Sequence, residues 1–492
     1  MKKIILGLVG AVMTLTAITS CKDLDLVPYD AVDVNTGFKT LQDAKYWNTG
    51  IYSAFRGRQY NAFNVIQETQ ADQLNASLDF GNRGGAAHRW GTFFQANDTQ
   101  APYRDYYSGL SNVNVVIKGY DAITVSAGAQ TDSLNTYKAD ARLARAFYLH
   151  ELVVRYAKPY NPATAATDLG VPLITEFDVL LKPARANVKA VYDQIIADIT
   201  YAKANNKRAN VRAARYFTPD AVLALDARVR LNMQDWAGAY TAANTLITSG
   251  RYPLYNTAVG LKSYWATDAT QEDIMRINAT LTETVATNVI YLGLNGAAGH
   301  FVPDFVPTQT VVDSYETADL RKLVYFEQKL IQIQGIRYPN IWLVNKFPGN
   351  PGLFTTPFTN YQNANKVFRI GEVYAIAAEA AERGGNAAGA LTALNALKVA
   401  RGIAPSVASG AALTQEVREE RTREMNFDGF RLWDLKRWGL GFTRGTPQNS
   451  LFLQNATGFT GLVVAAGDNK FVWGFPTNDV ILNPNIVQNP GW

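Results

Sequence analysis

One segment near the C-terminus, residues 416–438, limits what this chain can fold into more than any other. It holds six acidic and six basic residues, although charged residues make up only 18% of the chain. One helical face that starts at Leu413 passes through Glu420 and Glu424, where a packed helix normally carries apolar side chains. Inside a protein, such charges are tolerated only when each one is paired. Large rings follow closely and favour a buried ion network over a solvated face: Phe427, Phe430, Trp433 and Trp438.

The order of residues in this segment follows the pattern ER-x-x-E-(M/F)-x-F-(D/E)-G-x-R-x-W-D-L-x-R. The pattern resembles the C-terminal motif of SusD/RagB-like proteins, which are nutrient-binding outer-membrane lipoproteins of Bacteroidetes-type bacteria. The closing residues 483–492, NPNIVQNPGW, also resemble that family. We interpret the charged motif as scaffold that holds helices together and touches no ligand. The scaffold residues on this interpretation are Glu420, Arg421, Glu424, Asp428, Arg431, Trp433 and Asp434.

The N-terminus predicts export and lipid anchoring. Two lysines precede an apolar run at residues 4–18, which is too short to span a bilayer and has the length of a secretory signal. Residues 18–21, ITSC, resemble a bacterial lipobox, and Cys21 is the only cysteine of the chain. We therefore predict a signal peptide at 1–20, an acylated Cys21 and a tether at 21–36. An ordinary signal peptide that ends near a cysteine is the alternative. No later stretch is long enough for a transmembrane helix.

Charge and composition exclude several classes of function. Removal of residues 1–20 takes away two lysines, so the formal net charge falls from +5 to +3. Such a small charge predicts no nucleic-acid partner. With a single cysteine, the body must be stabilised by packing without disulfides. His88, His150 and His300 lie far apart in the chain, so no metal site and no cofactor is predicted.

Apolar residues recur at helical spacing over much of the chain. Helices are expected at 41–55, 103–120, 137–152 and 188–202. Residues 221–250 and 372–401 each predict two helices joined by a turn.

The two predicted hairpins look related. An overlay of Ala239 on Ala390 also aligns Ala227 with Ala378 and Leu246 with Leu397. By spacing alone, tetratricopeptide-type repeats and two unrelated hairpins are equally good explanations. The family resemblance implies the repeats.

Two regions break the helical pattern and are predicted to be loop-rich insertions, at about 75–102 and 257–368. The first is rich in glycine, and the second combines many prolines with short β-like fragments at 288–293 and 338–347. The predicted fold is therefore mostly α, with a tetratricopeptide-like, SusD-like helical-repeat scaffold and loop-rich insertions that carry short β pieces. Residues 37–492 are expected to form one domain.

No catalytic constellation is visible in the sequence. The three histidines suggest no Ser-His or Cys-His pair, there is no HExxH motif, and Gly81–Gly85 lacks the Lys-Ser/Thr of a phosphate loop. The densest acidic cluster, 416–424, is interleaved with arginines that lower carboxylate pKa values, the wrong direction for a general acid. We predict that the protein is not an enzyme.

The two insertions are the better candidates for function. Aromatic rings can stack on a sugar, while Asn, Asp and Arg bond to hydroxyls or carboxylates. Each ring could instead simply pack beneath its own loop. The predicted ligand contacts are Phe80, Asn82, Arg83, Trp90, Tyr291, Phe301 and Phe305.

The resemblance implies a surface-exposed, non-catalytic lipoprotein of the outer membrane. Such a protein captures oligosaccharides and delivers them to a SusC-like TonB-dependent transporter, with Cys21 as the lipid anchor. Peptides as cargo are the first alternative, because RagB-type members are thought to carry them. An all-α glycoside hydrolase is the second alternative, and a helical-repeat scaffold for partner proteins is the third.

Overall fold

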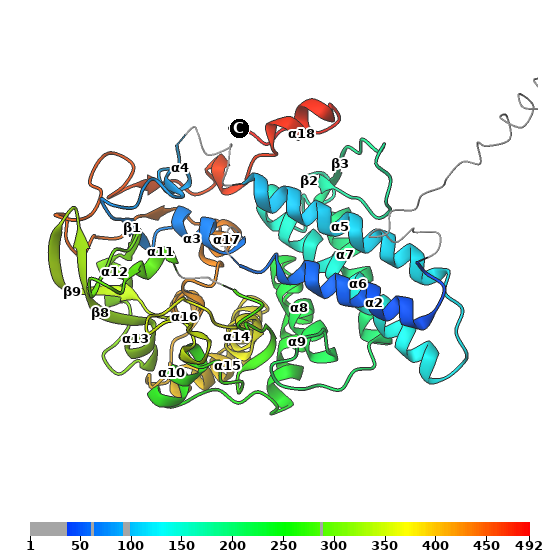
Figure 1. The fold of residues 1–492 in the computed structure, drawn as a ribbon, viewed down its shortest axis with the longest axis horizontal. Coiled ribbons are helices and arrows are strands. Elements are labelled where there is room, and N and C mark those ends of the chain that lie inside the picture. The colour runs from blue at the N-terminus through cyan, green and yellow to red at the C-terminus, as the bar shows by residue number, and fades with distance from the viewer. Residues whose placement is uncertain (1–36, 61–62, 92–98, 286–288) are drawn as a thin grey trace, which may run out of the picture.

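The computed structural model describes residues 37–60, 63–91, 99–285 and 289–492. The predicted signal peptide, the acylated Cys21 and the tether therefore lie outside the described residues. Most of the regular structure is helical, and several of the short strands lie at one end of the molecule (Figure 1). The predicted fold class is confirmed. Within the described ranges, no helix is both long enough and apolar enough to cross a bilayer.

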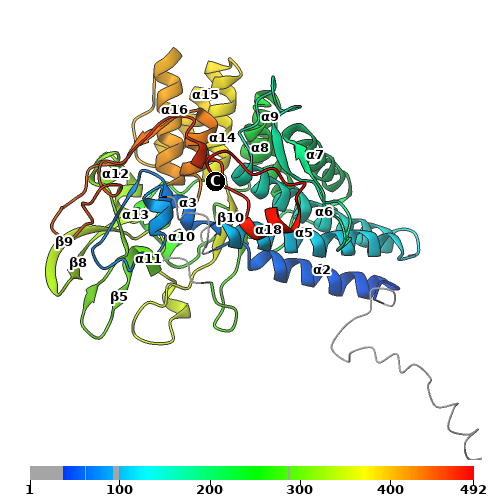
Figure 2. The ribbon, with the colours of Figure 1, turned by 90° about the horizontal axis from the view of Figure 1, so that it is seen from above.

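The scaffold is a series of helices in which each one contacts the next in chain order. They are α5 (Gln100–Asp121), α6 (Ala129–Tyr156), α7 (Val188–Asn205), α8 (Pro219–Asn232), α9 (Trp236–Thr248), α14 (Ile370–Arg383), α15 (Ala387–Ala400) and α16 (Gly410–Met425). An earlier helix, α2 (Leu41–Arg56), lies across α5 and α6. Helices α9 and α14 pack together although the whole second insertion separates them in sequence, as Figure 2 shows from above.

The two helical hairpins α8–α9 and α14–α15 share their local construction. The Asp235 carboxylate accepts a hydrogen bond from the backbone N–H of Gly238 at 3.0 Å, and the Asn386 side chain accepts one from Gly389 at 2.9 Å. Both caps satisfy an N–H that the first turn of a helix leaves without a partner. The overlay that aligns Ala239 with Ala390 also aligns the capping residues Asp235 and Asn386. The matching caps therefore support the prediction that the two hairpins are related repeats.

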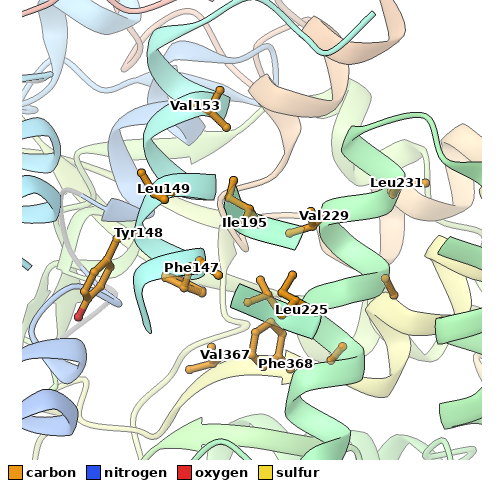
Figure 3. Packing of buried hydrophobic residues seen from close by; sticks show 14 of the residues in the cluster. Phe147, Tyr148, Leu149, Val153, Ile195, Leu225, Val229, Leu231, Val367 and Phe368 are labelled. Atoms are coloured by element: carbon orange, nitrogen blue, oxygen red, sulfur yellow. The ribbon is translucent and has the colours of Figure 1, made fainter. Parts of the chain in front are cut away.

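The main apolar core lies between these helices. Leu149 and Val153 of α6, Ile195 of α7, and Leu225 and Val229 of α8 are all buried and lie close together (Figure 3). Burying each such side chain contributes about 1.5–3 kcal/mol. Leu149 and Val153 thus form a face of α6 that packs against α7 and α8, whereas Tyr148 of the stripe that predicts the helix contacts Phe55 of α2 and Tyr106 of α5.

The insertions hold most of the short elements. Helix α3 (Val65–Gln70) precedes the first insertion, which carries most of β1 (Leu74–Ala76) and α4 (Gly85–His88). The second carries α10 (Ala258–Ala266), β4 (Asp273–Ile277), α11 (Val289–Leu292), β5 (Leu294–Asn295), β6 (His300–Phe301), β7 (Phe305–Pro307), α12 (Gln309–Asp313), α13 (Leu320–Tyr325), β8 (Phe326–Ile333), β9 (Ile336–Val344), η3 (Pro351–Leu353) and β10 (Asn365–Arg369). Strands β5, β6, β8 and β9 form a four-stranded sheet in that order, and β10 pairs with β4.

The predicted β fragments are partly confirmed. Strand β9 covers most of the fragment expected at 338–347. The fragment expected at 288–293 is wrong over Val289–Leu292, which forms the short helix α11. Four apolar residues are too few for periodicity to distinguish a strand from a helical turn. Gly293 follows at a φ of +57°, a conformation that suits the end of a helix.

The two insertions pack against each other. Strand β1 pairs antiparallel with β7, and the Ser77 hydroxyl donates a hydrogen bond to the Pro303 carbonyl at 2.7 Å. The Arg83 guanidinium binds both oxygens of the Asp304 carboxylate. Segments far apart in the sequence therefore build one body beside the helical scaffold.

The remaining elements close the chain or connect helices. They are β2 (Leu169–Pro172), β3 (Arg185–Asn187), α17 (Arg431–Trp438), β11 (Phe442–Thr443), β12 (Val463–Val464), η4 (Asn469–Phe471) and α18 (Thr477–Leu482). Strand β2 pairs with β3, and β11 pairs with β12.

The charged segment around α16 and α17 forms a buried ion network. Glu424 is fully buried and binds Arg321, Arg369 and Arg401. Arg321 also binds Glu420 at 2.7 Å. Further pairs join Arg421 to Asp434, Arg369 to Asp428 and Arg431 to Asp72. The prediction that these charges are buried and paired is confirmed. That the scaffold residues touch no ligand stays a prediction, because Arg421, Asp428, Trp433 and Asp434 also line the cavity described below.

Candidate ligand-binding site

A cavity of about 110 Å³ lies where the helical scaffold meets the second insertion. Its walls come from α6 and α8, from the segment between α2 and α3, from β10 and the residues just before it, and from the turn between α16 and α17. These elements surround the middle of the molecule in Figure 1. The cavity is therefore formed by the repeat scaffold together with the second insertion and the segment that follows α2.

Helix α6 supplies one wall from a single face. Phe147, His150, Glu151, Val154 and Arg155 recur at steps of three and four and all line the cavity. Leu149 and Val153 of the same helix pack against α7 and α8. One helix thus serves the core on one side and the cavity on the other.

Ion pairs hold the opposite wall in place. Arg228 of α8 donates two hydrogen bonds to the Glu372 carboxylate, at 2.6 and 2.7 Å. Arg421 Nε donates to Asp434 Oδ2 at 2.8 Å. The Phe430 ring lies between these two guanidinium groups, with its centroid 5.1 Å from the Cζ of Arg228 and 5.7 Å from that of Arg421. Such contacts fix side-chain geometry and contribute about 0.5–2 kcal/mol each.

A second stack lies deeper along α6. The Cζ of Arg155 lies 5.4 Å from the ring centroid of Tyr106 and 5.5 Å from that of Trp433. Its guanidinium also binds the Glu151 carboxylate and donates to the Phe63 carbonyl at 2.7 Å. Arg155 is therefore rigidly placed with one edge on the cavity.

The mouth of the cavity is polar and partly exposed. Arg58 donates to the backbone carbonyls of Ala54 and Asp105, and no carboxylate of the described residues pairs with it. The side-chain amides of Asn64 and Asn365 both donate to the Gln59 carbonyl. Their carbonyl oxygens remain available as acceptors within the described structure. Donors and acceptors of this kind, beside the ring of Tyr60, suit a ligand rich in hydroxyl groups.

The cavity walls also contain buried polar atoms that have no hydrogen-bond partner among the described residues. Seven residues carry eight such atoms: Gln67 Oε1, His150 Nδ1 and Nε2, Arg155 Nε, Trp265 Nε1, Tyr291 Oη, Arg421 Nη1 and Trp433 Nε1. Buried polar groups are almost always paired, and each unpaired group costs about 1–3 kcal/mol. Water or a polar ligand is therefore expected to occupy the cavity.

The ionisable groups of the cavity are held in fixed charge states. Burial lowers the pKa of His150, so its imidazole is neutral at pH 7. Burial alone would raise the pKa of Glu151, but the charge of Arg155 outweighs burial and holds that pKa well below its usual value. An ionised, paired carboxylate cannot serve as a general acid.

Four of the seven predicted ligand contacts have buried rings. Phe80 packs edge-on against Phe305 at 5.9 Å between ring centroids, and Trp90 packs against two other rings of the core. Tyr291 is also buried, but it is one of the residues that line the cavity. These rings cannot stack on a ligand in this conformation, because neighbouring side chains already cover them. Their role as ligand contacts stays a prediction, and the burial speaks against it for Phe80, Trp90 and Phe305.

The other three predicted contacts lie outside the cavity wall. Asn82 is exposed and accepts a hydrogen bond from Arg89 at 2.9 Å. The Arg83 side chain is 63% exposed and is held by its pair with Asp304. Phe301 is half-buried in β6. The structure thus brings Phe80, Arg83 and Phe305 together, but it does not place them around a common hollow.

Sequence reasoning missed the cavity wall on α6. The apolar stripe was enough to predict that helix, and its polar residues were assigned no binding role. A signal was present, because His150, Glu151 and Arg155 sit at helical spacing within a run that is otherwise almost wholly apolar from Ala146 to Tyr156.

The described part of the chain contains no group of three or more His, Cys, Asp or Glu side chains that could hold a metal ion.

Comparison with protein-family models gives two matches. A model described as the SusD family matches residues 318–492, and a SusD-like model described as "Starch-binding associating with outer membrane" matches residues 24–231. Together the two matches span most of the chain. The chain belongs to the SusD/RagB-like family. A comparison of this SusD-like protein with curated protein sequences found no match.

Solved structures of SusD-like proteins have the same fold. A SusD superfamily protein from Bacteroides thetaiotaomicron is 24% identical, with a TM-score of 0.77 over 92% of this chain and 100% of that chain. A protein from Bacteroides vulgatus described as a putative sugar binding protein is 23% identical, with a TM-score of 0.76 over 93% of this chain and 100% of that one. Surface glycan-binding protein A from Bacteroides fluxus is 21% identical, with a TM-score of 0.70 over 92% and 100%. At these identities the likeness shows the fold.

Proposed function

We propose that this SusD-like protein is a non-catalytic binding protein that captures oligosaccharides outside the outer membrane. The family description names starch binding and the outer membrane, and a relative of the same fold is a surface glycan-binding protein. The observation that carries the proposal is the cavity itself. A partly exposed mouth with Arg58, Asn64 and Asn365 leads to inner walls whose polar atoms lack protein partners. A ligand with many hydroxyl groups could form hydrogen bonds both with the mouth residues and with the unpaired polar groups of the walls.

The same geometry supports binding without catalysis. Glycoside hydrolysis needs a carboxylic acid with a raised pKa beside a second carboxylate. The carboxylates of the cavity wall, Glu151, Glu372, Asp428 and Asp434, each bind an arginine. Arginine neighbours favour the ionised form, which cannot protonate a leaving group.

We further propose that the protein is held at the membrane through a lipid on Cys21 and passes its cargo to a SusC-like TonB-dependent transporter. In this mechanism the body acts as a lid on the transporter barrel. Ligand that contacts lid and barrel together favours the closed state by its differential affinity for that state. Contacts from both partners also raise the apparent affinity without any chemical step. Purification of the lipidated protein from outer membranes in mild detergent is expected to bring the transporter with it.

The binding proposal can be tested by calorimetry on the soluble chain from residue 22. We expect saturable heat with at least one oligosaccharide from a panel of plant and host glycans. The Asn64→Ala variant should bind about tenfold more weakly, because it loses hydrogen bonds worth roughly 1.4 kcal/mol. The matched control is Asn485→Ala, which changes an exposed asparagine far from the cavity wall. Heat with peptide mixtures alone would overturn the oligosaccharide proposal in favour of peptide cargo.

A further inference from the structure

The charges of the cavity wall do not cancel. The wall holds six cationic side chains and four carboxylates. The four carboxylates pair with the cations of the same wall as Glu151–Arg155, Glu372–Arg228, Asp428–Arg369 and Asp434–Arg421. Lys366 lies 3.5 Å from a carboxylate outside the wall, that of Asp268. Arg58 is left with backbone carbonyls as its only partners among the described residues.

Among the unpaired atoms of the residues that line the cavity, those that can only donate outnumber those that can only accept. Arg155 Nε, Arg421 Nη1 and the two indole N–H groups can only donate, whereas Gln67 Oε1 can only accept. The Tyr291 hydroxyl and the His150 Nε2 can take either role. A group that supplies acceptor oxygens and no hydrogens matches this set better than a hydroxyl does. A carboxylate or a sulfate is such a group.

Arg58, whose only partners among the described residues are backbone carbonyls, and the residues with unpaired donors line the same cavity. The Cζ of Arg58 lies 5.6 Å from the centroid of the Tyr148 ring, which lies 5.9 Å from the ring of Tyr106. Tyr106 in turn faces Arg155, and Arg155 faces Trp433. An anionic group that enters beside Arg58 therefore shares the cavity with residues that carry further donors. A cavity of about 110 Å³ has room for roughly three to four waters, which is enough for one acidic group and not for a whole oligosaccharide.

We infer that the oligosaccharide taken by this site is acidic and that its carboxylate or sulfate group enters the cavity while the neutral sugar rings lie at the mouth. This inference rests on the proposed function of the same cavity. Uronic acids and sulfated sugars share the chemistry that the wall recognises. A neutral oligosaccharide would fill the hydrogen bonds but would leave the excess positive charge without a partner.

The test is calorimetry on the soluble chain from residue 22 with three tetrasaccharides: tetragalacturonate, a sulfated chondroitin tetrasaccharide and neutral cellotetraose. We expect at least one acidic ligand to bind ten or more times tighter than the neutral one, and the difference to shrink as salt is raised. The comparison of the carboxylate with the sulfate ligand shows which source of negative charge the site accepts.

Substitutions can show whether weaker binding comes from loss of a charge contact or from loss of the folded structure. Arg58→Gln should weaken binding of the acidic ligand about tenfold and binding of the neutral ligand by a clearly smaller factor, because glutamine keeps a hydrogen-bond donor and loses the charge. Arg337→Gln, at an exposed arginine of β9, is the matched control and should change neither. Tyr291→Phe removes only a hydroxyl that has no partner in the described structure, so it should fold normally and weaken binding of the acidic ligand about fivefold.

The possible outcomes distinguish failure of the acidic preference from failure of the proposed oligosaccharide binding. Equal or tighter binding of the neutral ligand, or an equal loss for both ligands in Arg58→Gln, would overturn the acidic preference and leave the oligosaccharide function standing. Binding of peptides with no glycan binding would overturn both. A crystal structure with tetragalacturonate in which the cavity holds only water would also refute the inference.

Discussion

Replacing Glu424 by glutamine tests whether the buried ion network holds the scaffold together. The Glu424 carboxylate is fully buried and accepts hydrogen bonds from Arg321 at 3.1 Å, from Arg401 at 3.0 and 2.9 Å, and from Arg369. Glutamine keeps the shape, removes the charge and turns one acceptor oxygen into a donor that faces guanidinium groups. Hydrogen bonds to charged groups contribute about 1.5–3 kcal/mol each. Because the three arginines keep other carboxylate partners, we expect the free energy of unfolding to fall by about 3–5 kcal/mol, as for other broken buried pairs.

Urea unfolding followed by circular dichroism at pH 7 measures this change. The control is Glu419→Gln on the same helix, where the carboxylate is 50% exposed and lies 3.9 Å from Arg423. Exposed pairs contribute little, so the control should lose less than about 0.5 kcal/mol. A loss below about 1 kcal/mol for Glu424→Gln would refute the structural role of the network.

The free energy of unfolding of Glu424→Gln should also depend on pH differently from that of the wild-type protein. Burial raises the pKa of Glu424, but Arg401 and Arg369 outweigh burial and hold that pKa well below the ordinary value of 4.5. A carboxylate with a depressed pKa in the folded state stabilises the protein above its unfolded pKa, and this contribution is lost as pH falls toward the folded value. The wild-type protein should therefore lose stability as the pH drops below about 4.5, and Glu424→Gln should lose less over the same range. Parallel curves for the two proteins would contradict this assignment.

Three further predictions concern the repeats, the junction of the insertions and the anchor. Asp235→Ala and Asn386→Ala should each lower the free energy of unfolding by about 1 kcal/mol, because each removes a helix N-cap, and denaturant titration against wild type checks this. Arg83→Ala should speed hydrogen exchange in β1 and β7, since it breaks the pair with Asp304 that joins the two insertions; unchanged exchange there would show that strand pairing alone holds the junction. Cys21→Ala should move the protein from the membrane fraction to the soluble fraction, and a variant that stays with membranes would exclude the lipid anchor.

The helical scaffold could be predicted because its signal is local. The apolar stripe at Tyr137, Ala141, Ala144, Tyr148 and Leu152 falls within α6, and the charge pattern around Glu424 correctly indicated a buried network. Both depend on spacing along a single helix. The helix boundaries were less exact, since α6 extends beyond the predicted 137–152 at both ends.

The candidate site could not be predicted in the same way, because its walls come from segments far apart in the sequence. Phe80 and Phe305 looked like exposed loop aromatics, yet pairing of β1 with β7 across more than 200 residues buries both against each other. The role of Arg155 depends on Trp433 and Phe63, which no local pattern connects to it. Short apolar runs such as Val289–Leu292 lack the length that periodicity requires.

The most direct test of the account is a crystal structure of the soluble chain with a bound oligosaccharide. The account predicts sugar rings at the mouth, within hydrogen-bond distance of Asn64 and Asn365, with one substituent directed toward Arg155. An oligosaccharide bound to another face, with only water in the cavity, would contradict it.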